Sequence, residues 1–167
     1  DQGKQGQTVE KKTIASGTKY ATDLYIIESG KPGPVVMIVG GVHGSETAGY
    51  RAANKVKDYS IKKGTLIVIP EANKLAIEAG RRSAPGGSDL NRQFPQSSSS
   101  SPKGTLAKAI YNVVKEYDVD WLMDMHEMIT YLTLKMSLVL YWLILTIKNI
   151  FYGCQLLEYQ KIIDFKM

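Results

Sequence analysis

The residues Val35–Val39, VVMIV, with Gly40 and Gly41 directly after them, decide the fold of this chain of 167 residues. An apolar run without alternation is typical of a strand that is buried on both faces, as in a parallel sheet covered by helices. Leu66–Ile69, LIVI, has the same character, and Trp121–Met125, WLMDM, is a third candidate strand. The sequence therefore predicts a sheet built around these strands.

Segments with helical periodicity separate the predicted strands. Thr47–Tyr59 carries a stripe of side chains spaced for one helix face, and Thr105 is placed to cap a second amphipathic helix that runs through Tyr117. The first stripe consists of Ala48, Ala52, Val56 and Tyr59. Residues 81–102 are rich in Pro, Gly and Ser, which predicts a loop. With a further strand predicted at Tyr20–Glu28, this order indicates an α/β fold of the doubly wound kind.

The composition is that of an ordinary globular protein, with 44% hydrophobic and 22% charged residues. A single cysteine, Cys154, excludes an internal disulfide and any site built from several cysteines. Because the chain has two histidines, a histidine-dependent mechanism can use only His43 and His126. The net charge of +5 is spread thinly and forms no basic patch with interleaved aromatic residues, so we expect no nucleic-acid partner.

The first residues of the chain indicate where in the cell the protein is expected. The chain begins with Asp1 rather than Met, and the polar residues up to Lys12 contain no apolar signal segment. This start fits a protein exported after its leader is removed, with a cytoplasmic location as the alternative.

Both histidines follow a predicted strand. His43 lies in the sequence GGVHGSE with Glu46 three residues later, and His126 follows Trp121–Met125 directly. In open α/β sheets ligands bind beyond the carboxyl ends of the strands, so these side chains can converge. Two histidines and one glutamate suit a catalytic zinc ion with water in an open fourth position. Taken singly, a histidine at a strand end is more often a polar surface group than a metal ligand.

A second motif, SDLNRQFP at Ser88–Pro95, follows Arg81 and Arg82 in the predicted loop. Asn91 and Arg92 provide an amide and a guanidinium, which together can hold a substrate carboxylate and polarise a carbonyl. An Asx-type turn with a solvated arginine is the alternative interpretation of this pair alone. The order of GGVHGSE, the arginine pair, DLNRQFP and DMHE in one chain is more specific than any one of these motifs.

With these motifs, the segment from Val35 to Glu127 resembles the M14-like zinc hydrolases of the metallocarboxypeptidase superfamily, and most closely their succinylglutamate desuccinylase/aspartoacylase branch. The resemblance implies a three-layer α/β/α fold with a mixed, largely parallel sheet, of which this chain is the front portion. It also implies one zinc ion, bound by His43, Glu46 and His126.

The resemblance further implies roles in a reaction. Asn91 and Arg92 match the family's substrate-binding pair, and Arg82, with Arg81 as the alternative, matches the arginine that polarises the scissile carbonyl. Asp124 is interpreted as a carboxylate that supports a zinc ligand, or as a residue that ends the strand. The implied substrate is an N-acyl amino acid, which would be deacylated, or a peptide, which would lose its C-terminal residue. Since no glutamate matches the family's general base, an inactive zinc-binding remnant is the remaining alternative.

The end of the chain differs from the rest. Residues 1–127 are predicted to be the N-terminal part of a zinc hydrolase catalytic domain, and residues 128–167 an atypical apolar tail without family resemblance. We interpret this tail as the product of a shifted reading frame or a truncated gene. Met136–Ile147, MSLVLYWLILTI, is shorter than the roughly 20 residues of a membrane helix, so we expect no span. Glu127 follows a ligand in extended chain, so its side chain is expected to point away from the metal.

Overall fold

Five strands form one sheet in the computed structural model, which describes residues 6–97 and 99–127. They are β1 (Thr8–Ile14), β2 (Thr22–Glu28), β3 (Val35–Gly40), β4 (Thr65–Ile69) and β5 (Trp121–Met125), in the order β1-β2-β4-β3-β5. β3 pairs in parallel with β4 and with β5, whereas β2 pairs antiparallel with β1 and with β4. The sheet is therefore mixed, as predicted.

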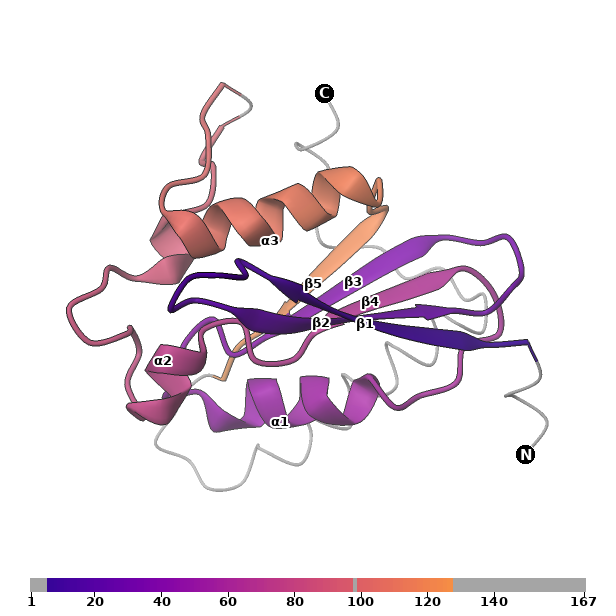
Figure 1. Ribbon diagram of the computed structural model, residues 1–167, viewed down its shortest axis with the longest axis horizontal. Helices are drawn as coiled ribbons and strands as arrows, with labels where there is room; N and C mark the ends of the chain where they lie inside the picture. The colour runs from indigo at the N-terminus through magenta and orange to yellow at the C-terminus, as the bar shows by residue number, and fades with distance from the viewer. Residues whose placement is uncertain (1–5, 98, 128–167) are drawn as a thin grey trace.

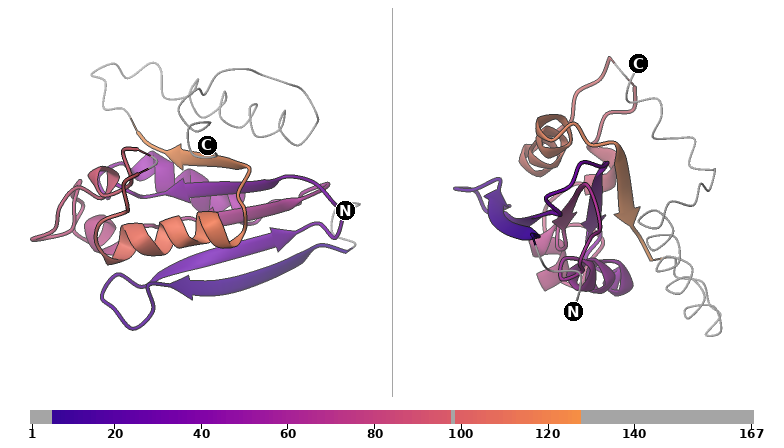
Figure 2. Two further views of the ribbon diagram at one scale, coloured as in Figure 1. Left: turned by 90° about the horizontal axis from the view of Figure 1, so that it is seen from above. Right: turned by 90° about the vertical axis from the view of Figure 1, so that its right-hand side faces the viewer.

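Helices cover both faces of this sheet (Figures 1 and 2). α1 (Thr47–Val56) lies on one face and α3 (Thr105–Glu116) lies on the other. Two short pieces, α2 (Lys74–Glu78) and the 3-10 turn η1 (Leu90–Arg92), follow β4. The predicted three-layer α/β/α arrangement is confirmed for the described residues.

The unbroken apolar run of β3 is explained by hydrophobic neighbours on both of its faces. Met37 and Val39 belong to a buried cluster with residues of α3, whereas Val36 and Ile38 belong to a second cluster with residues of α1. All four side chains are at most 4% exposed. Because burying a side chain of this size contributes about 1.5–3 kcal/mol, this strand anchors both cores.

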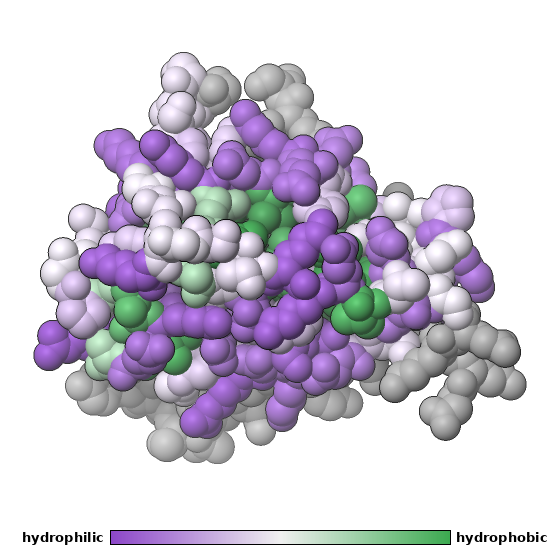
Figure 3. Space-filling view, viewed as in Figure 1, coloured by the Kyte–Doolittle hydropathy of each residue, from purple (hydrophilic) through white to green (hydrophobic). Residues whose placement is uncertain are grey.

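β1 forms in a segment that has no apolar pattern. Its sequence, TVEKKTI, is exposed along nearly its whole length, and hydrophilic residues cover the middle of the face on which β1 lies (Figure 3). Seven residue pairs, from Thr8 opposite Glu28 to Ile14 opposite Thr22, join it to β2. Backbone pairing therefore holds this edge strand, and sequence periodicity gives no signal for it.

α1 is shorter than predicted, and its buried positions differ in part from the predicted stripe. The buried positions are Gly49, Ala53 and Val56, while Tyr59 lies beyond the end of the helix and is 40% exposed. Val56 is buried as predicted, and Ala52 is partly buried against the same cluster, whereas the prediction of Tyr59 in the stripe is wrong because the helix ends before it.

The predicted tail, with the apolar stretch Met136–Ile147, lies outside the described residues. Within the described residues, no helix is both long and apolar enough to cross a bilayer.

Candidate metal centre

Two strands end and one helix begins at the same edge of the sheet. His43 lies three residues past the end of β3, and His126 is the first residue after β5. These two strands are parallel neighbours, with Gly40 opposite Met125, so their carboxyl ends meet. Glu46 is the residue immediately before α1, and its backbone N–H donates to the carbonyl of His43 in a tight turn.

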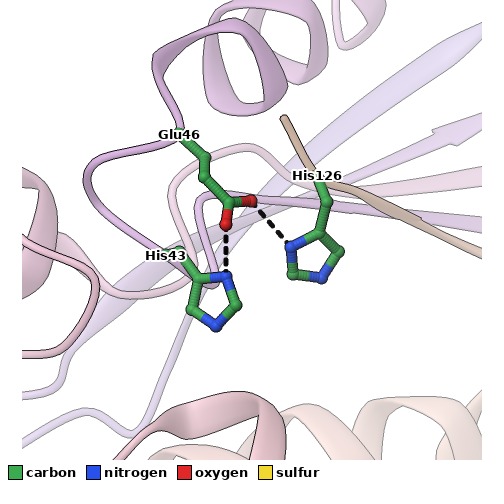
Figure 4. Close-up of side chains that lie close together, drawn as sticks. All are labelled: His43, Glu46 and His126. Atoms are coloured by element: carbon green, nitrogen blue, oxygen red, sulfur yellow. Dashed lines mark hydrogen bonds and ion pairs between the residues drawn. The ribbon is translucent and has the colours of Figure 1, made fainter. Parts of the chain in front are cut away.

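Glu46 lies between the two histidines and bonds to both (Figure 4). Nδ1 of His43 donates to Oε1 at 2.7 Å, and Nδ1 of His126 donates to Oε2 at 2.8 Å. One ligand atom from each of the three residues lies within 4.8 Å of the other two. His43 is buried, and the His126 side chain is 33% exposed. The structure thus brings together the three residues predicted as metal ligands.

The outer nitrogen of each histidine is held by a second carboxylate. Nε2 of His43 donates to Oδ1 of Asp89 at 2.9 Å, and Nε2 of His126 donates to Oδ2 of Asp124 at 2.7 Å. The bond from Asp124, helped by Glu46 and opposed by desolvation, raises the pKa of His126 to about 9. Of the two interpretations of Asp124, support of a ligand agrees with this contact.

The carboxylates of the site stay ionised because of their partners. Burial alone would raise the pKa of Glu46, but the backbone N–H of Glu127 and the two histidines outweigh burial and lower it. Burial likewise opposes ionisation of Asp89, and the bonds from His43, Arg82 and the N–H of Asn91 lower its pKa. The imidazole of His43 therefore lies between two ionised carboxylates.

This arrangement has the chemistry of a metal site. Two imidazole nitrogens and one carboxylate are the donor set of a catalytic zinc ion. The inner Nδ1 atoms face Glu46, while the outer nitrogens are bonded to carboxylates, as is usual for metal-ligating histidines. The residues present fit a divalent metal ion whose ligands are already oriented.

Arg82 is the member of the arginine pair that reaches the centre. Its Nε donates to Oδ2 of Asp89 at 3.1 Å, and its Nη1 lies 3.4 Å from Oε1 of Glu46. The guanidinium stays half exposed at the rim of the site. Arg81, the alternative, is exposed and has no such contact within the described part of the chain.

The Asn91–Arg92 pair lies in η1, which begins inside the site. Oδ1 of Asp89 accepts from the backbone N–H of Asn91 at 3.0 Å as well as from His43. The side chains of Asn91 and Arg92 have no hydrogen-bond or ion-pair partner among residues 6–97 and 99–127. The main chain at Asn91 is thus joined to His43 through Asp89.

Sequence reasoning missed two residues of the centre. Asp89 is the first residue of the DLNR motif. An Asp side chain often accepts a hydrogen bond from the backbone N–H two residues later, as Asp89 does from Asn91, and this spacing is the signal that could have identified it. Glu127 was expected to point away from the metal, and its Oε2 accepts from the backbone N–H of Ala48 at 2.9 Å. No pattern in the sequence links Glu127 to a helix so far away along the chain.

Comparisons with known sequences give consistent matches. The model of the succinylglutamate desuccinylase/aspartoacylase catalytic domain matches residues 32–143, which includes a stretch past the last described residue. N-alpha-acetyl-L-2,4-diaminobutyric acid deacetylase of Halomonas elongata is 32% identical over 102 residues, which is 57% of this chain and 29% of that protein. The chain thus spans less than a third of the length of this relative.

Solved structures share the arrangement of strands and helices. An aspartoacylase family protein from Mesorhizobium loti superposes with a TM-score of 0.58 at 29% identity, over 72% of this chain and 40% of that one. A metallo-carboxypeptidase from Burkholderia cenocepacia superposes with a TM-score of 0.56 at 14% identity, over 74% and 37%. At that identity the second comparison shows a common fold alone.

Proposed function

The chain belongs to the succinylglutamate desuccinylase/aspartoacylase family, as its motifs predicted, and from this premise we propose that it is a zinc-dependent hydrolase that removes the acyl group from an N-acyl amino acid. The observation that carries the proposal is the convergence of His43, Glu46 and His126. These residues would hold one zinc ion, and Asp89 and Asp124 would keep the two imidazoles in place.

The chemistry that a bound zinc ion supplies is the activation of water near neutral pH and the polarisation of a carbonyl oxygen. Arg82 adds a positive charge at the rim of the site, where it can donate a hydrogen bond to a developing oxyanion. Its contact with Asp89 fixes the direction of the guanidinium without burying it. Arg82 would thus stabilise the transition state of amide hydrolysis.

Asn91 and Arg92 are suited to bind the carboxylate of the substrate. A guanidinium can pair with a carboxylate through two parallel hydrogen bonds, and the neighbouring amide can donate a third. Asp89 bonds both to His43 and to the backbone N–H of Asn91, so the main chain that carries this pair is joined to one of the three predicted ligands. An amino-acid carboxylate bound here would place the adjacent amide bond near the centre.

None of Glu46, Asp89 and Glu127 is assigned as the proton acceptor of the reaction. Glu46 accepts from both histidines, Asp89 accepts from His43 and Arg82, and Glu127 accepts from Ala48. Each of these carboxylates is already engaged in holding the site together. A general base needs an oxygen that is within reach of the reacting water.

Deacylation is preferred to peptide cleavage because of the sequence comparison. The relative with 32% identity carries the name of an N-acetyl amino acid deacetylase, while the metallo-carboxypeptidase at 14% identity shares the fold alone. We therefore expect small N-acyl amino acids to be the substrates.

The test measures metal content and turnover with the purified chain. Wild type is expected to bind about one zinc ion per chain, and His43→Ala and His126→Ala to bind much less. N-acetyl and N-succinyl amino acids, including N-alpha-acetyl-2,4-diaminobutyrate, are then assayed beside short peptides. Equal zinc in all three proteins would overturn the site. Cleavage of peptides alone would favour a carboxypeptidase, and bound zinc without turnover on either class would favour an inactive remnant.

A further inference from the structure

α1 and β5 are distant in sequence, yet their backbones are in direct contact beside the metal centre. Gly49 of α1 packs on the carbonyl oxygen of Met125, and a Cβ at position 49 would overlap that oxygen. One of these elements is preceded by Glu46 and the other is followed by His126. The relative position of α1 and β5 therefore sets the distance between two of the three ligands.

The start of α1 lacks the cap that its own sequence would normally provide. Glu46 occupies the N-cap position, but its carboxylate makes no hydrogen bond to the helix, because both oxygens face the histidines. An N-cap side chain usually accepts from the first backbone N–H groups of a helix. Here the carboxylate of Glu127, two residues past the end of β5, accepts from the N–H of Ala48 at 2.9 Å.

Glu127 also contacts the ligand through its main chain. Its backbone N–H donates to Oε2 of Glu46 at 3.1 Å, the same oxygen that accepts from His126. One residue thus bonds to the helix with its side chain and to the metal-ligand carboxylate with its backbone. Together these bonds hold the end of β5 against the start of α1.

We propose that Glu127 is a positioning residue of the metal centre, which replaces the cap that Glu46 gives up when its carboxylate turns to the histidines. This inference rests on the proposed function, because it concerns the same three ligands. Glu127 is neither a ligand nor a proton acceptor in this role. It acts on the metal through Glu46 and His126, by fixing the distance between the two elements that carry them.

The role requires a side-chain oxygen that is long enough to accept from the N–H of Ala48. Substitutions of Glu127 separate the effect of side-chain length from that of charge. Glu127→Met keeps the length of the side chain and removes the acceptor. Glu127→Gln keeps an acceptor at the same reach and removes the charge. Glu127→Asp keeps the charge and shortens the reach by one methylene. The matched control is Glu116→Met, since Glu116 is an exposed glutamate at the end of α3, and α3 ends near the start of β5 rather than near its carboxyl end, which His126 follows.

The experiment measures Zn²⁺ affinity of the purified full chain by competition with a chromophoric chelator, at a temperature where circular dichroism shows each variant to be folded. Loss of a group that orients a metal ligand weakens affinity by about 10- to 100-fold, and we expect this of Glu127→Met. Glu127→Gln is expected to stay within about threefold of wild type, because a neutral oxygen also caps a helix. Glu116→Met should match wild type.

A purely structural role gives a different result: Glu127→Met would unfold at a lower temperature without metal, yet bind Zn²⁺ as wild type does once folded. That outcome overturns the inference and leaves the proposed function intact. If Glu127→Met does not fold, the Zn²⁺ affinities of the other two variants decide. If the length of the side chain matters, Glu127→Asp binds Zn²⁺ more weakly than Glu127→Gln. If the charge matters, Glu127→Gln binds more weakly. Failure of wild type to bind Zn²⁺ would instead refute the metal centre itself.

Discussion

Oδ1 of Asp89 lies 2.9 Å from Nε2 of His43, on the side of the imidazole opposite Glu46. The same carboxylate bonds to Arg82 and to the backbone N–H of Asn91. Asp89 thus joins His43, a proposed metal ligand, to the residues proposed to bind substrate. Its removal should affect both metal affinity and the loop that carries η1.

Replacing Asp89 by alanine is expected to weaken Zn²⁺ binding by about 10- to 100-fold, because His43 loses the acceptor that orients its ring. Competition with a chelator measures the change. Asp58→Ala is the control, since Asp58 is an exposed carboxylate whose ion-pair partner is the neighbouring Lys57. Unchanged affinity in Asp89→Ala would show that Glu46 alone is enough to orient the histidine.

Arg82 and Arg81 offer a matched pair for the proposed reaction. Arg82→Ala is expected to lower kcat by about 10²- to 10³-fold, the usual effect of losing one oxyanion donor, while zinc content stays the same. Arg81→Ala should keep its activity, because Arg81 makes no contact with the centre within the described residues. Steady-state kinetics on an N-acyl amino acid measures both. An equal loss in the two variants would contradict the assignment to Arg82.

The contact of Gly49 with β5 can be tested by the sign of a stability change. In an exposed helix position, Gly→Ala stabilises a protein by about 0.5–1 kcal/mol. At Gly49 the new methyl group would overlap the carbonyl of Met125, so we expect Gly49→Ala to destabilise the chain by about 1–3 kcal/mol. Urea unfolding measures the free energy, with Arg51→Ala on the exposed side of α1 as the control. A stabilised Gly49→Ala would show that α1 can move away from β5 without cost.

Asp23 gives a pH-dependent contribution to stability. Its Oδ2 lies 3.1 Å from Nζ of Lys74 and 3.4 Å from Nζ of Lys11. Desolvation opposes ionisation, but Lys74 and Lys11 outweigh it and lower the pKa of Asp23 from its ordinary value of 3.8. Because the folded state has the lower pKa, the contribution is complete well above the ordinary pKa of 3.8 and is lost as the pH falls through the folded value.

Asp23→Asn should therefore be about 0.5–1 kcal/mol less stable than wild type at neutral pH. The difference should shrink as the pH falls below about 4. A series of urea unfolding curves across this range measures it, and Asp58→Asn, at an exposed ion pair, should show little difference at any pH. If the difference in unfolding free energy between wild type and Asp23→Asn did not change with pH, the charge of Asp23 would contribute nothing to stability.

Much of the fold could be predicted because β3 and β4 are buried on both faces. Such strands need apolar residues at every position, so VVMIV and LIVI are visible without any partner. β1 could not be predicted, because it is held by pairing with β2 and is exposed to water. The burial of Gly49 in α1 could not be predicted, since Gly49 fits against β5 by lacking a side chain and leaves no hydrophobic signal.

Residue types and their order along the chain determined the family, the buried strands and the identity of the three predicted ligands. These features are local: a strand end, a turn of four residues and a loop motif each lie within one short segment. Only the tertiary structure decided that Asp89 and Asp124 hold the outer nitrogens, that Arg82 rather than Arg81 reaches Glu46, and that Glu127 caps α1. The physical reason is that a hydrogen bond between distant segments depends on how the sheet brings them together. The sequence around a carboxylate does not identify the donor that it will bond to.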